Sequence, residues 1–323
     1  MLRRGLTLFA LLALAAPAHA TTFKGRADAG PSIAGDSVVW GQEYSDGSGA
    51  VKRDGKVIAH FSDPAGKRRH RLFGQVPGGV SASPTRVAYA LVTSTEDPPN
   101  GQGDVGGSSS EVTARLSVGG GAFTDPLGCT GSYISTAAEG DSVALGVSGG
   151  CEGVYLNGRK ISDTPSAEVH LAGPYVAWLA QAKDGITIAD AATGTAVSTI
   201  KGEFGRFDLD AAGNVITAQG DAIVAFTVSD DNPRVLCTRA WASSVATAGG
   251  RVAYITANKT SGPKALVVAD LATGKVLRTL ERFNDHRWPN GELALTDHRI
   301  AWSVRHGGYE ENKARGIVRT VRL

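Results

Sequence analysis

The stretch Val245-Ala246-Thr247-Ala248-Gly249-Gly250-Arg251-Val252-Ala253-Tyr254 sets two short apolar runs on either side of a Gly-Gly turn. Glycine adopts positive φ without steric cost, so this arrangement predicts a tight β-hairpin. The second run belongs to a repeated triplet that follows a small polar or glycine turn and often ends in an aromatic residue. Its seven copies are Val38-Val39-Trp40, Val87-Ala88-Tyr89, Val143-Ala144-Leu145, Val176-Ala177-Trp178, Val215-Ile216-Thr217, Val252-Ala253-Tyr254 and Ile300-Ala301-Trp302.

The spacing of these copies matches a propeller blade. The first and last copies begin 262 positions apart, so the mean period is about 44 residues, which suits one four-stranded blade. A second hairpin follows the triplet: Asp54-Gly55 and Asn157-Gly158 are dipeptides that tolerate positive φ at both central turn positions. The related turns Ala189–Gly194 and Ala269–Gly274 lie eighty residues apart, two blade lengths. We label the strands of each blade A to D, with the triplet on B.

The ends of the chain predict a closed ring. After the last triplet only one further strand remains, residues 315–323, so the seventh blade lacks its outer strand. Residues 21–27 precede the first blade and can supply it, which protects an otherwise open sheet edge. We therefore predict an all-β, seven-bladed propeller with four-stranded antiparallel blades. An open two-sheet sandwich, or two stacked sandwiches, is the alternative that repeat count, period and closure disfavour.

These turns and strands resemble secreted bacterial propellers of the TolB-like and WD40-like kind. The shared features are a Gly-Asp or Gly-Arg turn before a Val-Ala-Trp strand and an Asp-x-x-Thr-Gly-Lys turn in the outer hairpin, as at Asp270–Lys275. The resemblance covers most of the chain after residue 20. It implies a propeller that binds partners, and it transfers no catalytic residue.

The first twenty residues have the order of an export signal: Arg3 and Arg4, an apolar core from Leu6 to Ala16, then Ala18-His19-Ala20. We expect cleavage after Ala20, which leaves 21–323 as one secreted or periplasmic propeller domain. The apolar core is too short to span a bilayer, so no membrane anchor is expected. Removing the two arginines takes the formal charge from +2 to 0. A neutral chain has no general attraction for nucleic acid, so we expect no nucleic-acid partner.

Loop lengths differ between the two faces of the predicted ring. The A-to-B turns are minimal, whereas the D-to-A and B-to-C connections are longer and chemically varied, and long loops often carry function. One candidate ligand-binding loop is Lys67–Arg71; a second group precedes the sixth and seventh blades. A solvated charge run and a tryptophan that fills a gap between blades are the plain alternatives. The candidates are Arg68, Arg69, His70, Arg71, Arg239, Trp241, Asp285, His286, Arg287 and Trp288.

Signals for catalysis, metals and cofactors are weak. His70, His170 and His286 are expected on D-to-A connections, where Glu168 or Asp285 could serve as acid or base. The oxygen-rich stretch Thr93–Glu111 matches no calcium loop, and its composition is typical of a flexible excursion. A dinucleotide fingerprint at residues 101–106 lacks the βαβ unit it needs. We expect no catalytic residue, no metal and no cofactor.

Cysteine positions predict one disulfide. Cys129 and Cys151 each lie eleven residues from Gly140, the turn of the third A-to-B hairpin, so they face each other across it. Cys237 remains unpaired and is expected to be buried. The sequence thus favours a binding or scaffolding propeller that presents its loop-rich face to an extracellular or periplasmic protein, peptide or glycan. The alternative is a propeller enzyme, a hydrolase or lyase acting on a carbohydrate or lactone.

Overall fold

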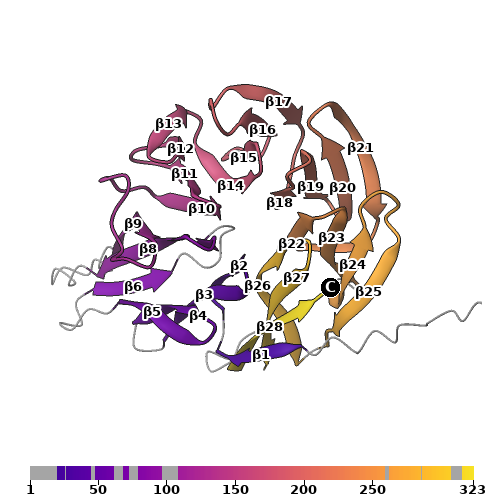
Figure 1. The fold of residues 1–323 in the computed structure, drawn as a ribbon, viewed down its shortest axis with the longest axis horizontal. Coiled ribbons are helices and arrows are strands. Elements are labelled where there is room, and N and C mark those ends of the chain that lie inside the picture. Colours follow the sequence, from indigo (N-terminus) through magenta and orange to yellow (C-terminus); the bar gives the residue numbers. More distant parts are fainter. Residues whose placement is uncertain are drawn as a thin grey trace, which may run out of the picture.

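The computed structural model shows seven four-stranded antiparallel sheets arranged in a ring (Figure 1), and the innermost strands line a central channel. It describes residues 20–323 except 26, 45–47, 62–67, 73–78, 97–107, 259–261, 285 and 307–314. The predicted export signal therefore lies outside the described residues. The predicted fold class is confirmed.

Strands follow chain order from the channel outward in blades 1 and 3 to 6. Blades 1, 3 and 4 are β2 (Ala29–Ala34), β3 (Ser37–Glu43), β4 (Gly49–Arg53), β5 (Lys56–Phe61); β10 (Tyr133–Glu139), β11 (Ser142–Ser148), β12 (Gly153–Leu156), β13 (Arg159–Ser162); and β14 (Ser166–Ala172), β15 (Tyr175–Ala180), β16 (Gly185–Asp190), β17 (Ala196–Lys201). Blades 5 and 6 are β18 (Phe207–Leu209), β19 (Asn214–Gln219), β20 (Ala222–Thr227), β21 (Asp230–Cys237); and β22 (Ala240–Ala248), β23 (Arg251–Ala257), β24 (Pro263–Asp270), β25 (Val276–Arg282).

The seventh blade closes the ring with both ends of the chain. Its order is β1-β28-β27-β26, formed by β26 (Arg287–Leu295), β27 (Arg299–His306), β28 (Arg315–Arg322) and the N-terminal β1 (Thr21–Lys24). Thr21 pairs with Thr320 and Lys24 with Ile317. The Phe23 ring lies 5.5 Å from the Trp40 ring of blade 1. Closure by the N-terminal strand, predicted from the missing outer strand, is confirmed.

The repeated triplets lie on the second strand of each blade and are buried. Both faces of a blade are covered by its neighbours, so consecutive residues of the strand all face core, which explains an apolar run in place of an alternating pattern. The five aromatic triplet residues are buried as expected: Trp40, Tyr89, Trp178, Tyr254 and Trp302. Trp302, for example, packs with Ile255 and Leu266 of blade 6.

Outer turns have the conformations that their sequences predict. Asp54 and Gly55 have φ of 48° and 84°, and Asn157 and Gly158 have 51° and 81°. The repeated Ala-Thr-Gly turns are held by an aspartate: Asp190 accepts hydrogen bonds from the Thr193 N–H (2.8 Å) and hydroxyl (2.9 Å). These bonds lower the pKa of Asp190, because they favour its carboxylate form.

Blade 2 departs most from the regular pattern. Its inner strand is divided into β6 (Arg68–Leu72) and β7 (Val80–Ala82), which both pair with the long β8 (Arg86–Glu96). Residues 68–71, expected in a loop, are therefore strand, because β8 extends well past β7. The strand β9 (Ser108–Val118) completes the sheet, and two isolated bridges, Leu116 to Thr124 and Val112 to Gly131, continue beyond it.

The predicted disulfide is present between Cys129 and Cys151. It extends the β10–β11 hairpin, in which Tyr133 pairs with Ser148, and ties the segment beyond β9 to blade 3. Cys237 is free and half-buried. Among the described residues there is no helix long and apolar enough to cross a membrane.

Candidate functional site

The central channel contains a cavity of about 670 Å³ to which every blade contributes. Its walls are the inner strands, represented from blade 1 to blade 7 by Ser32, Ser81, Thr136, His170, Asp208, Thr247 and Glu292. The cavity extends to the A-to-B turns, including Ala211, Gly249 and Asp297. The cavity therefore reaches the face with the short turns, whereas the sequence favoured the face with longer loops.

His170 occupies the wall of this cavity between two carboxylates. Glu168 and His170 are two residues apart on β14, so both side chains point to the same side of the strand. The His170 Nε2 lies 2.9 Å from a Glu168 carboxylate oxygen, and its Nδ1 lies 2.8 Å from Asp208 on β18. Glu168 is 4% exposed and His170 is 24% exposed. Each ring nitrogen of His170 thus has a carboxylate as its hydrogen-bonding partner.

The charge of His170 follows from these contacts. Burial alone lowers the pKa of His170, but the hydrogen bonds and charges of Asp208 and Glu168 outweigh it and raise the pKa from 6.5 to about 10. At neutral pH the ring is an imidazolium that donates both N–H groups. It neutralises part of the negative charge that Glu168 and Asp208 bring into the channel.

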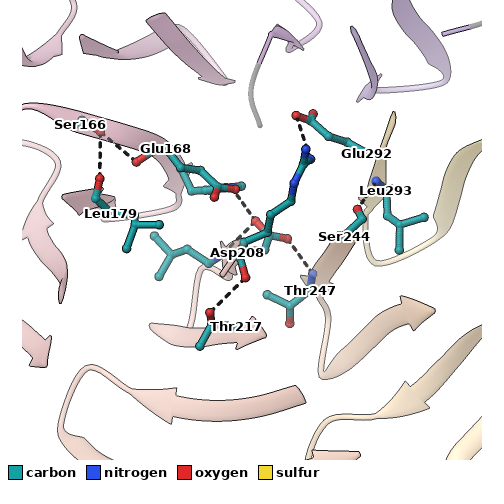
Figure 2. A network of polar contacts seen from close by, with 12 residues as sticks. Ser166, Glu168, Leu179, Asp208, Thr217, Ser244, Thr247, Glu292 and Leu293 are labelled. Atoms are coloured by element: carbon teal, nitrogen blue, oxygen red, sulfur yellow. Dashed lines mark hydrogen bonds and ion pairs between the residues drawn. The ribbon is translucent and has the colours of Figure 1, made fainter. Parts of the chain in front are cut away.

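Hydrogen bonds that involve backbone atoms hold Asp208 and Glu168 in place (Figure 2). The second oxygen of Asp208 accepts from the Thr247 N–H of β22 at 2.7 Å, so one aspartate joins blades 4, 5 and 6. The buried Ser166 hydroxyl donates to the Glu168 carbonyl at 3.0 Å, where the β14–β15 register shifts. This bulge positions the Glu168 side chain over the channel.

A second charged pair spans blades 5 and 7. Arg206 lies 3.8 Å from the Glu292 carboxylate of β26, a loose ion pair. The Thr217 hydroxyl donates to the Arg206 carbonyl at 3.0 Å and holds the segment before β18 (Figure 2). Tyr133 of β10 interacts electrostatically with Glu168 and Glu292. Burial raises the pKa of Tyr133, and the charges of the two glutamates raise it further. The Tyr133 phenol is therefore neutral.

The cavity is acidic overall. Six carboxylates lie in its wall, those of Glu139, Glu168, Asp208, Asp210, Glu292 and Asp297. Among the described residues of the wall, the cations are Arg206 and the protonated His170, so the six carboxylates give this part of the wall a negative formal charge. A concave site lined mainly by one sign of charge concentrates ions of the opposite sign.

The structure brings together part of the residues proposed from the sequence. Trp241 of β22 and Trp288 of β26 meet edge to face, 6.2 Å between ring centres. Arg287 binds Glu281 of β25. Arg239 and His286 are exposed directly before β22 and β26. Asp285 lies outside the described residues. Arg68, Arg69, His70 and Arg71 belong to β6 of blade 2 and do not join this group.

The sequence predicted His170 on a D-to-A connection, but the residue lies within β14. Asp208, Glu292 and Glu281 were not predicted as site residues, because their partners come from other blades. The Glu-x-His pattern of Glu168 and His170 on an inner strand was the sequence feature that pointed to this site. Among the described residues, no group of three or more His, Cys, Asp or Glu side chains is arranged to hold a metal ion.

Comparisons with known proteins show the fold. No protein-family model matches the chain, and no curated protein matches it in sequence. The β-propeller domain of Cps50 (Swd1) from Myceliophteria thermophila is similar in structure, with a TM-score of 0.51 and 13% identity over 95% of this chain and 100% of that one. Apo AztD from Citrobacter koseri has a TM-score of 0.44 and 13% identity, covering 79% of this chain and 72% of its own. The first likeness agrees with the seven-bladed β-propeller fold described above.

Proposed function

We propose that this chain is an exported binding propeller that takes a small, positively charged organic ligand, a primary amine or guanidinium compound, into its channel. The observation that carries the proposal is the charged network of Glu168, His170, Asp208, Arg206 and Glu292 around a cavity of about 670 Å³. A cavity of this size holds a small molecule.

The cost of this network supports a functional role. Each ion withdrawn from water costs several kcal/mol unless it is paired, and apolar residues fill a propeller channel at lower cost. Here Glu168 is 4% exposed and depends on His170 for its charge partner. Charged groups held at such a cost in a cavity are characteristic of ligand sites.

An enzyme is the second candidate, and one observation favours it: His170 lies within hydrogen-bonding distance of two carboxylates in the central cavity. A general base, however, needs an unprotonated nitrogen near the operating pH. His170 has a pKa of about 10 and donates both N–H groups, which suits a structural cation better than a proton acceptor. We therefore prefer binding to hydrolysis or elimination on a carbohydrate or lactone.

Calorimetric titration tests the proposal with two probes of equal chain length, 1,5-diaminopentane and glutarate. The purified protein should bind the diamine and not the dicarboxylate, and added salt should weaken binding. Replacing Glu292→Gln should weaken diamine binding about tenfold, which corresponds to about 1.4 kcal/mol. The matched control Glu152→Gln, exposed and outside the cavity wall, should leave it unchanged.

Two results would contradict binding in the channel. One is the absence of binding heat with the diamine, and the other is an equal affinity of the wild-type protein and Glu292→Gln for it. The enzyme candidate is tested separately by hydrolysis of a simple lactone such as dihydrocoumarin. Turnover that disappears in His170→Gln would replace the binding function by catalysis.

A further inference from the structure

A cluster of arginines and tryptophans joins blades 6 and 7 away from the cavity. Glu281 at the end of β25 is 4% exposed, and its carboxylate accepts hydrogen bonds from Arg287 of β26 and Arg319 of β28. Two guanidinium groups therefore share one carboxylate, which leaves a net charge of +1. None of the three side chains belongs to the cavity wall.

The two arginines retain hydrogen-bonding capacity. A guanidinium has five N–H donors, and Glu281 accepts from one terminal nitrogen of each arginine. The Nε atoms of Arg287 and Arg319 are buried and have no partner among the described residues. Because these Nε atoms are buried, the donors that a ligand can reach are the terminal N–H groups of the two guanidiniums that Glu281 does not use.

The same end of blades 6 and 7 provides accessible surface. Arg287 and Arg319 are 32% and 27% exposed, so a ligand can reach them. Trp241 and Trp288 are half-buried, and their ring centres lie 6.2 Å apart. Both lie at the starts of inner strands, the end of the blades at which β25 reaches Glu281. Indole rings offer a large, amphipathic face to which a sugar ring can bind. Arg239, directly before β22, is exposed and adds positive charge.

From these contacts we infer that blades 6 and 7 form a binding site for an acidic sugar. The sugar ring lies against Trp241 and Trp288, and its oxyanion binds Arg287 and Arg319. Carboxylate and phosphate share this chemistry, because a guanidinium forms charge-assisted hydrogen bonds with either. In this arrangement Glu281 competes with the ligand for the two arginines.

Three hexoses test the inference by calorimetry: galacturonate, galactose 6-phosphate and neutral galactose. At least one acidic sugar should bind more than tenfold tighter than galactose, and the stronger of the two identifies the oxyanion. Equal binding of all three would overturn the arginine part of the site. A dipeptide such as acetyl-Glu-Glu that binds more tightly than both acidic sugars would overturn the sugar part.

Two substitutions with opposite effects separate binding from folding. Arg287→Gln should weaken binding of the preferred acidic sugar at least tenfold, whereas Glu281→Gln, which removes the internal competitor, should strengthen it several-fold. A fold defect cannot strengthen binding, so weakening by both variants would refute the site. Arg278→Gln, exposed on the same strand as Glu281, is the matched control. Glu292→Gln in the channel should leave sugar binding intact, so this site can fail or succeed independently of the proposed function.

Discussion

Replacing His170→Gln removes the one cation that lies between Glu168 and Asp208. The pKa of His170 rises from 6.5 to about 10 on folding. One pKa unit corresponds to about 1.4 kcal/mol, so the protonated ring contributes at most about 5 kcal/mol to the free energy of unfolding. Because the ring is 24% exposed, solvent screens part of this interaction, and we expect about 2–4 kcal/mol.

The sign of the pH dependence follows from the raised pKa. The contribution is fully present below pH 6.5, where both the folded and unfolded states carry the proton. Between pH 6.5 and about 10 only the folded state retains it, so raising the pH costs up to about 1.4 kcal/mol per pH unit. Above about pH 10 the contribution is lost.

Urea unfolding of both proteins at pH 6, 8 and 9.5 measures this difference. At pH 6 the wild-type protein should be more stable than His170→Gln by about 2–4 kcal/mol. At pH 9.5 most of that difference should have disappeared. A gap of equal size at all three pH values would refute the charged-histidine account and leave only a packing effect of the ring.

Three further predictions concern the fold. Replacing Cys129 and Cys151 by serine removes a link across 22 residues and should lower the free energy of unfolding by about 3 kcal/mol, measured in urea; equal stability of the reduced and oxidised wild type would contradict this. Asn157→Ala loses the acceptor for the Val143 N–H and places alanine at φ 51°; it should cost about 1–2 kcal/mol, and a change below 0.5 kcal/mol by the same assay would oppose it. Deleting Thr21–Lys24 exposes the β28 edge and should promote association; a monomer of unchanged stability on size-exclusion chromatography would show that β1 is dispensable.

Local chemistry made the fold predictable. The strand triplets, the Asp54-Gly55 and Asn157-Gly158 turns and the missing last strand depend on residues close together in the chain, and each appears in the structure as its sequence indicates. The inner strand of blade 2 was harder to predict, because β8 continues beyond β7 to pair with β6. The residue pattern of β8 does not indicate which segment pairs with the end of β8 that extends past β7.

The candidate sites were predictable only in part, because their geometry depends on contacts between blades. Trp241 and Trp288 are 47 positions apart but share one surface, since both lie at the starts of inner strands. Asp208 gains its role only when blades 4, 5 and 6 pack side by side and bring it to His170 and Thr247. Each of these separations is close to one blade period, but the period alone does not tell which side chains of neighbouring blades meet.

A crystal structure of the protein with 1,5-diaminopentane would show directly whether the channel holds the ligand. We expect the diamine inside the channel, with an ammonium group within hydrogen-bonding distance of Glu292 or Glu168. A diamine on the outer surface, or a channel without it at a concentration that saturates binding in solution, would contradict the claim that the charged channel is the ligand site.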